Sequence, residues 1–160
     1  MSSLDALDAL PSHPAVTWVP FHVAHAMTMS IKSQNMETIS RMLPVHQMLE
    51  MQAMCGQAIT AIIHGRPAAC FGAVKVWKGV EELWLLVEER ARKFPILMTK
   101  AAKDFADYRV ISENLHRLQI TVRSNDPRAI QWAKRIGFEA EAVLQKYGPD
   151  QMNYILMRKV

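Results

Sequence analysis

The amino-acid sequence predicts an α/β protein: one domain around a mixed β-sheet of about six to seven strands, flanked by about four helices. Three consecutive segments between Gln57 and Val87 have the composition of strands and are separated by glycine-containing turns. Two later segments with helical spacing begin at Pro95 and Pro127 and enclose a strand-like segment. A run of strands followed by alternating helices and strands is typical of a mixed sheet covered by helices.

The N-terminal part of the chain divides into an arm, residues 1–14, and the start of a domain that covers residues 15–160. Pro11 and Pro14 break any early helix, so we expect the opening residues to be loose. The β-branched and aromatic residues of Ala15–His22 then predict the first strand.

Two helices are expected next, Val23–Ile31 and Met36–Met54, and the second is interrupted at Pro44. Seven of the eleven methionines lie between Met27 and Met54, which indicates either adaptable core packing or the wall of a binding groove. Flexible methionine side chains suit both roles, so the sequence leaves both open.

Three strands of the sheet should follow one another directly. Gln57–Gly65 ends at a glycine turn and pairs with Ala68–Trp77, and a Lys-Gly turn then leads into Val80–Val87. The second half of Val80–Val87 is apolar almost throughout, which is typical of a strand covered on both faces. We therefore expect Val80–Val87 at the centre of the sheet, with His116–Ser124 parallel beside it.

The last third of the chain alternates helix and strand. The helix that begins at Pro95 has five residues available to one side: Ile96, Leu97, Ala101, Phe105 and Tyr108. After the strand His116–Ser124, Asn125 or Asp126 caps a helix that ends at Gly137, where a left-handed conformation is expected. Phe138 should then fill the core beside this helix. Two further strands complete the sheet: Glu139–Tyr147 and Met152–Val160.

Composition excludes several classes of protein. Half of the residues are hydrophobic, and no apolar run approaches the roughly 20 residues of a membrane-spanning helix. The N-terminus has acidic residues and no basic region, so we expect no signal peptide. Cys55 and Cys70 have no paired spacing, and we expect both to be reduced in a cytoplasmic protein.

The net charge of +4 is unevenly distributed along the chain. Residues 86–160 hold 14 Lys and Arg against 9 Asp and Glu, whereas residues 1–85 are close to neutral. This basic half favours an anionic partner, such as a phosphate-bearing cofactor, a nucleic acid or an acidic protein surface. Nucleic acid is the least favoured of the three, because the aromatic residues are scattered rather than clustered.

Metal binding is not expected. His22 and His25 are three positions apart, and His46 lies further along the chain. No carboxylate or cysteine completes a ligand set with them at a suitable spacing.

The segment HRLQITVRSNDPRAIQWAKRIGFEAEAVLQKYG, residues 116–148, resembles the C-terminal part of the GNAT superfamily of N-acetyltransferases. The matching features are the strand LQITV, Asn125 after it, the helix Ala129–Ile136 and the Gly-Phe pair that follows. The HR-x-Q-x-T-V strand and the turn Tyr147–Asp150 are most similar to phage-encoded GNAT-like proteins, among them the internal virion protein A group of podophages.

This resemblance implies a GNAT-like fold, with acetyl-coenzyme A as cofactor and an amine as acceptor. Coenzyme A would lie between the strands Val80–Val87 and His116–Ser124, in the manner of an added strand. Its pyrophosphate would meet the N-terminus of the helix that begins at Pro95. The residues implied to bind the cofactor are Val87, Arg90, Arg92, Lys93 and Asn125.

The chain departs from the superfamily pattern at two places. Pro95 and Leu97 occupy positions of the phosphate loop that are small residues in the family, so a donor is lost and close approach is obstructed. Ala133 stands where many GNAT enzymes carry a tyrosine as general acid. Arg92 occupies the arginine position of the loop, so an anion is still favoured there.

Glu82, on the central strand, is the residue expected to act as the base, directly or through water. The alternatives for this role are Glu81, His64 and His116. The sequence does not decide among them.

Two functions from different classes remain open. The first is a coenzyme A-dependent N-acetyltransferase, which the fold resemblance and Arg92 favour. The second is a catalytically degenerate phage structural or internal virion protein that acts through contacts with virion or host proteins. The departures at Pro95, Leu97 and Ala133 favour this second reading, and they predict slow or absent turnover. A phage-encoded protein would occur in the host cytoplasm and the virion.

Overall fold

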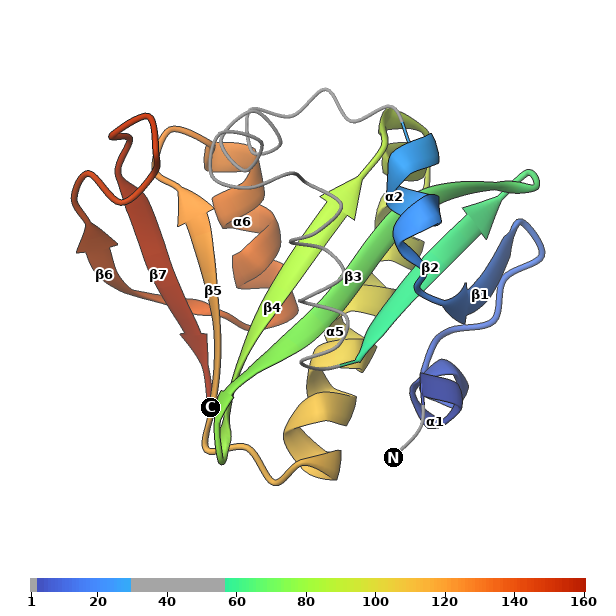
Figure 1. Ribbon diagram of the computed structural model, residues 1–160, viewed down its shortest axis with the longest axis horizontal. Coiled ribbons are helices and arrows are strands. Elements are labelled where there is room, and N and C mark those ends of the chain that lie inside the picture. The colour runs from blue at the N-terminus through green and yellow to red at the C-terminus, as the bar shows by residue number, and fades with distance from the viewer. Residues whose placement is uncertain (1–2, 30–56) are drawn as a thin grey trace.

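The structure is a computed structural model that describes residues 3–29 and 57–160, and these form one seven-stranded mixed sheet with helices against it (Figure 1). The strands are β1 (Val16–Pro20), β2 (Ala58–Ile63), β3 (Arg66–Trp77), β4 (Val80–Val87), β5 (Arg117–Arg123), β6 (Glu139–Leu144) and β7 (Tyr154–Lys159). The helices are α1 (Ser3–Asp8), α2 (Val23–Thr28), the 3-10 helix η1 (Glu89–Lys93), α5 (Pro95–Ser112) and α6 (Pro127–Ile136). The predicted mixed α/β fold is confirmed. The helix expected at Met36–Met54 lies outside the described residues, as do Cys55 and His46.

The N-terminal residues do not form the loose arm that the sequence predicts. They begin with α1, and Ala6 and Leu10 are buried in the same hydrophobic cluster as Phe105 of α5. Ala6 and Leu10 are four residues apart, a spacing that brings both to one side of a helical turn. Pro11 and Pro14 come after this turn, so they end the helix instead of preventing it.

The sheet has the order β1-β2-β3-β4-β5-β7-β6, which places β4 in the middle. The turn between β2 and β3 consists of His64 and Gly65, both with positive φ, 50° and 75°. Such two-residue turns match the twist of antiparallel strands. Gly79, with φ of 80°, has the same function between β3 and β4. Of the sheet's pairings, that between β4 and β5 is parallel, as expected.

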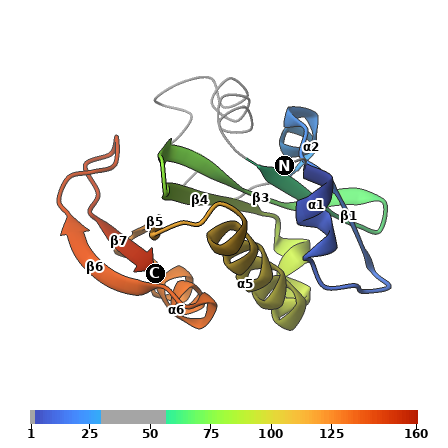
Figure 2. The same ribbon diagram turned by 90° about the horizontal axis from the view of Figure 1, so that it is seen from below.

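Helices α5 and α6 cover one face of the sheet (Figure 2). On α5, four of the five residues expected to face the sheet are buried or partly buried: Leu97, Ala101, Phe105 and Tyr108. The fifth, Ile96, is 84% exposed. Ile96 is the second residue of α5, and its direction there points away from the sheet, so this part of the prediction was wrong.

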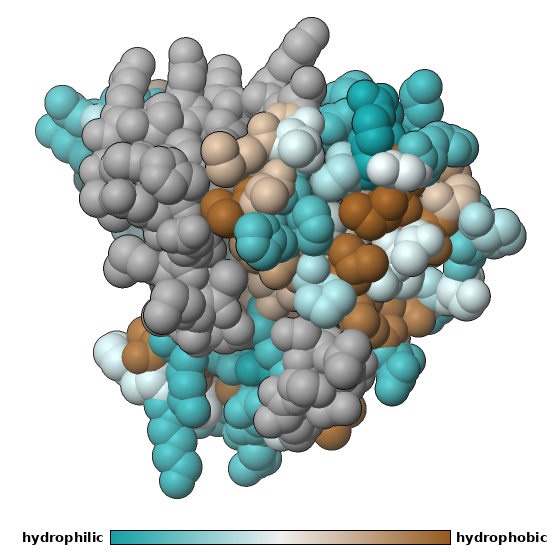
Figure 3. All heavy atoms as spheres, turned by 45° about the vertical axis from the view of Figure 1, so that its right-hand side comes forward, coloured by the Kyte–Doolittle hydropathy of each residue, from teal (hydrophilic) through white to brown (hydrophobic). Residues whose placement is uncertain are grey.

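The opposite face of the sheet carries α2. Ala26 and Met29 are buried against Cys70 of β3 and Leu86 of β4. Hydrophobic side chains also reach the surface on the side of the molecule that bears α2 and β1 (Figure 3). Met27, next to Ala26 on α2, is 70% exposed. The two faces of β4 therefore meet different helices.

The ends of α6 follow the predicted pattern. The Asp126 side chain accepts a hydrogen bond from the Ala129 N–H at 3.0 Å, so Asp126 rather than Asn125 caps the helix. Gly137 ends α6 in the left-handed conformation with φ of 109°. The Lys159 ammonium donates to the carbonyl of Ile136 at 2.8 Å, and Phe138 is buried beside the helix.

A buried ion pair joins β4 to α5. The guanidinium of Arg109 donates two hydrogen bonds to Glu81, at 2.9 Å from Nε and 2.5 Å from a terminal nitrogen. The side chains of Arg109 and Glu81 are 4% and 1% exposed. A buried pair of this kind does not by itself stabilise a fold strongly, but its removal on one side leaves an uncompensated charge.

We predict that Arg109→Met lowers the free energy of unfolding by about 3–5 kcal/mol, because Glu81 would remain buried without its partner. Adding Glu81→Leu should restore most of the loss, since two apolar side chains of similar size would replace the pair. Urea denaturation of the single and double variants measures both effects. A double variant no more stable than Arg109→Met would contradict this account of the pair.

Candidate active site

A cleft lies where β4 and β5 separate. The two strands share three register pairs, the last of them Glu82 with Gln119, and then diverge. Beyond this point they leave a space of about 180 Å³ between the sheet and helices α5 and α6. Its lining is largely apolar and includes Leu83, Leu85, Ile120, Val122 and Ala133.

Peptide groups of β4 face this cleft without a strand partner. Beyond Glu82, β4 continues to pair with β3, up to Val87 opposite Ala69, but no longer with β5. Backbone groups on the β5 side are therefore available to an extended ligand that lies along the strand. The side chain of Val87 packs into an apolar cluster, so Val87 can contribute only its backbone.

The N-terminus of α5 lies close to α6 at one end of the cleft. Trp132 of α6, which lines the cleft, donates from its indole nitrogen to the Thr99 hydroxyl of α5 at 2.9 Å. The first N–H groups of a helix have no partner within the helix, and α5 has no side-chain cap. Pro95 supplies no N–H, so fewer donors are present than in a helix with a glycine-rich start.

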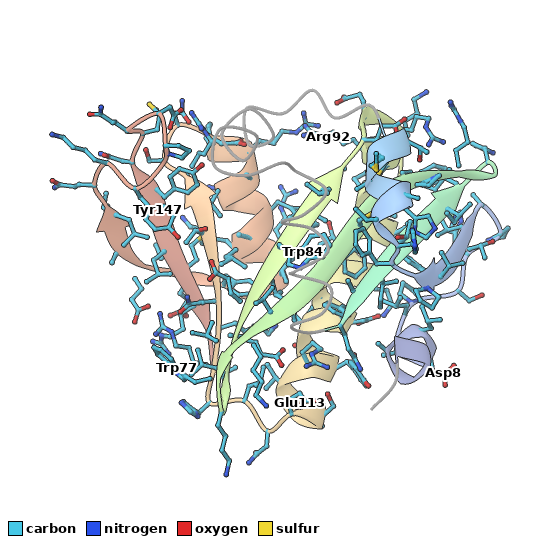
Figure 4. All side chains as sticks on the ribbon, in the orientation of Figure 1. Asp8, Trp77, Trp84, Arg92, Glu113 and Tyr147 are labelled. Atoms are coloured by element: carbon cyan, nitrogen blue, oxygen red, sulfur yellow. The ribbon has the colours of Figure 1, made fainter. Side chains whose placement is uncertain are left out.

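Two of the predicted cofactor-binding cations lie free to contact a ligand at this end. Arg92 and Lys93 are exposed at the end of η1, and the nearest carboxylate to Arg92 is that of Glu89, at 3.6 Å. Figure 4 shows Arg92 at the end of the molecule where β4 finishes, with Trp77 and Glu113 at the opposite end. Asn125 is also exposed, in the turn between β5 and α6.

Arg90 has a different environment from Arg92. Its Nε donates to Glu88 at 2.7 Å, and its terminal nitrogens donate to the carbonyls of Ile63 at 2.9 Å and Pro67 at 2.8 Å. These bonds attach η1 to the β2–β3 hairpin. The structure therefore supports a structural role for Arg90, and its predicted contact with the cofactor gains no support from its position.

The adjacent residues Glu81 and Glu82 point to opposite faces of the sheet, as strand geometry requires. Glu81 is held by Arg109 on the α5 face, which removes it as a candidate base. Glu82 is partly buried on the other face. Burial raises the pKa of Glu82 above its ordinary value, and hydrogen bonds with Gln119 and Thr121 partly offset that rise.

Tyr147, in the loop between β6 and β7, is a site residue that the sequence did not single out for chemistry. Burial raises the pKa of Tyr147, and the Glu82 carboxylate raises it further, so the two side chains lie within electrostatic reach. Its ring packs edge to face on Tyr154 of β7, with 5.2 Å between centroids. Ala133, at the position of the expected tyrosine, is buried in the wall of the cleft.

The other residues considered from the sequence lie apart from this constellation. His64 forms the β2–β3 turn, and His116 packs beside Gly79. The pKa of the Cys70 thiol is raised to about 11, because the effect of burial is larger than that of the hydrogen bond with Thr60, which lowers it. Among the residues described, no group of three or more His, Cys, Asp and Glu side chains could hold a metal ion.

Comparison with solved structures identifies the fold. Ard1 from Thermoplasma volcanium superimposes with a TM-score of 0.72 at 17% identity, over 91% of this chain and 97% of that one. A GNAT-family acetyltransferase from Bacillus anthracis gives 0.72 at 12% identity, over 93% and 96%. RimL, a ribosomal L7/L12 α-N-protein acetyltransferase solved with coenzyme A, gives 0.68 at 11% identity, over 94% and 97%.

The chain therefore has the fold of the GNAT acetyltransferases, as its C-terminal sequence indicated. No protein-family model and no curated protein matches it in sequence. The similarity to phage-encoded proteins stays a prediction from the sequence. In the part of the chain that the structure describes, none of the helices is long and apolar enough to cross a membrane.

We predict that Arg92→Ala weakens binding of coenzyme A about tenfold or more, because it removes a charge-assisted hydrogen bond to phosphate. Isothermal titration calorimetry measures the change. Lys78→Ala is the matched control, since Lys78 is an exposed cation in the β3–β4 turn, at the end where Figure 4 labels Trp77. Equal affinities for Arg92→Ala and Lys78→Ala would remove Arg92 from the binding site.

Proposed function

We propose that this chain is a coenzyme A-dependent N-acyltransferase that transfers an acetyl group from acetyl-coenzyme A to an amine. The observation that carries the proposal is the place of Glu82. A partly buried carboxyl group stands in the last register pair before β4 and β5 part, on the face of the sheet opposite α5 and α6. A base at the point where the strands part is suited to remove a proton from an amine that reaches, from that face, a group bound between them.

The residues around the cleft fit acetyl-coenzyme A. The apolar walls suit the pantetheine arm, and the unpaired backbone of β4 suits its amide groups. Arg92 and Lys93 are exposed at the end of η1, just before the N-terminus of α5, and Asn125 is exposed just before α6, so all three suit contact with phosphate groups at these helix N-termini. When bound, the cofactor supplies an acyl group activated as a thioester.

Glu82 has the properties of a general base in this setting. As a carboxylate it accepts a proton from the amine, directly or through one water molecule, so that the nitrogen lone pair can attack the acyl carbon. Burial brings its pKa closer to neutrality than that of an exposed glutamate, which increases its basicity. Trp84, two residues further along β4 on the same face, packs edge to face on Phe21 and forms an aromatic wall beside it.

Protonation of the departing thiolate has no dedicated residue on α6. Ala133 carries no proton, so water or the hydroxyl of Tyr147 must provide it. The raised pKa of Tyr147 keeps this hydroxyl protonated at neutral pH. Loss of a positioned acid lowers the rate without abolishing turnover, because water can protonate a thiolate.

A second candidate function is binding without efficient turnover, in a phage particle or against a host protein. Ala133 in place of an acid, Pro95 at the first turn of α5 and the engagement of Arg90 within the protein all favour it. A protein of this kind would bind coenzyme A weakly or not at all, and would act through its surface.

We predict that Glu82→Gln lowers kcat/KM for acetyl transfer about 10²–10⁴-fold, the usual contribution of a general base. The wild-type rate should fall as pH decreases through the pKa of Glu82, because protonation removes the base. This acidic limb of the pH–rate profile should lie at a higher pH than an exposed glutamate would give, because the pKa of Glu82 is raised. Release of coenzyme A with a panel of amines and amine-bearing peptides measures both effects.

Glu139→Gln is the matched control, because Glu139 is exposed at the start of β6. It should leave the rate and its acidic limb unchanged. Robust turnover that survives Glu82→Gln with the same pH profile would assign the base to another residue. Coenzyme A binding with no turnover on any amine would favour the second candidate function.

A further inference from the structure

A chain of polar side chains crosses the sheet from β6 to Glu82. The guanidinium of Arg117 is held by both oxygens of Glu141, at 3.1 and 2.5 Å. The Nε of Arg117 also donates to the side-chain oxygen of Gln119 at 2.8 Å. Gln119 in turn stands opposite Glu82 in the last register pair of β5 with β4, so the two side chains lie next to each other on one face of the sheet, and the Gln119 side chain lowers the pKa of Glu82.

The chemistry of arginine determines the direction of this chain. A guanidinium has only donors, so the atom of Gln119 that meets Arg117 must be its carbonyl oxygen. The NH₂ group of Gln119 is then left to face Glu82, where it can only donate. A reversed amide would place its NH₂ group against the N–H donors of Arg117 and its oxygen against the carboxylate oxygens of Glu82. Both contacts are unfavourable, so the amide keeps one orientation.

We propose that Gln119 is a positioning residue for Glu82, and that Arg117, anchored on Glu141, fixes the direction in which the Gln119 amide donates. The inference rests on the proposed function of Glu82 as a base, which it deepens by naming the residues that regulate that base.

The surroundings of Glu82 show why this donor matters. From β5 it meets Gln119 and Thr121, and from the β6–β7 loop the hydroxyl-bearing ring of Tyr147. Its register partner on β3 is the apolar Val74. The cation in this set of contacts is Arg117, and the Gln119 amide lies between it and Glu82.

An amide placed between Arg117 and Glu82 affects the pKa of the carboxyl group differently from a direct ion pair. A cation in contact with a carboxylate lowers its pKa strongly and holds it in place, as the geometry of Glu81 with Arg109 illustrates on the other face. A neutral donor stabilises the carboxylate less. The Gln119 amide thus lowers the pKa of Glu82 against the effect of burial, without pairing the carboxylate with a cation.

The test is the titration of the Glu82 carboxyl carbon by ¹³C NMR in the full chain, with the signal assigned by its loss in Glu82→Gln. Gln119→Met keeps the length of the side chain and removes its donors. We expect the pKa of Glu82 to rise by about one unit in this variant. An unchanged pKa in a folded Gln119→Met protein overturns the proposal. This measurement needs neither cofactor nor turnover.

The role of Arg117 needs a control for charge. Arg117→Met removes both a cation and the contact that directs Gln119, whereas Arg158→Met removes a cation that lies opposite Gln119 on β7 and is paired with Glu141, while the Gln119 oxygen is bonded to Arg117. We expect a clear upward shift of the Glu82 pKa in Arg117→Met and a smaller one in Arg158→Met. Equal shifts would show that only charge matters, and would overturn the positioning role of Arg117.

Kinetics separate this inference from the proposed function. If Glu82 is the base, Gln119→Met should move the acidic limb of kcat by the shift that NMR reports, with KM for the cofactor changed less than twofold. A limb that stays in place while the NMR pKa moves would show that Glu82 is not the base, although the positioning contact is real. Absence of both shifts overturns the positioning role alone.

Discussion

β4 and β5 are paired through three residues each, and the hydrogen bonds of this short parallel ladder are the constraint on which the site depends. Parallel strands need a crossover connection, here η1 and α5, which returns the chain to the start of β5 beside the start of β4. The strands therefore meet near Val80 and Arg117 and separate towards their carboxyl ends. The cleft, the free backbone of β4 and the helix N-termini at its end all follow from this separation.

The same three pairs explain why two neighbouring glutamates have unrelated roles. Because successive side chains of a strand alternate between faces, Glu81 meets Arg109 of α5 while Glu82 meets Gln119 and the open face. The ion pair attaches α5 to β4 at the level where β5 is also attached. Rigid packing below Glu82 thus supports a carboxyl group that must hold its place at the edge of an open cleft.

Local signals in the sequence were sufficient for most of the fold. Prolines at the first positions of α5 and α6, and Gly137 after α6, act within a few residues and were interpreted correctly. Helix α1 was missed because Ala6 and Leu10 are buried in a cluster with Ile59, Phe71 and Phe105, which lie in distant parts of the chain. Propensity near prolines could not reveal that cluster.

The candidate site was predictable only in part, for a similar reason. Glu82 could be chosen from its strand, and the alternation of the strand separates it from Glu81. The role of Arg90 depends on carbonyls of the β2–β3 hairpin more than 20 positions away, and that of Arg117 on Glu141 of the edge strand. The residues near Arg90 do not indicate where the β2–β3 hairpin lies, and those near Arg117 do not indicate how β6 is aligned in the sheet. Both contacts therefore become visible only in the folded chain.

The basic character of the C-terminal half also changes meaning in the fold. Arg109 neutralises a glutamate of the N-terminal half, and Arg90 donates to backbone carbonyls, so neither contributes to an exposed basic surface. Arg92, Lys93 and Arg128 remain exposed, on η1 and in the first turn of α6. Since α5 and α6 are joined there by the bond from Trp132 to Thr99, these cations come from elements that flank one end of the cleft. A modest net charge thus becomes a local field that favours an anion where the helix N-termini also favour one.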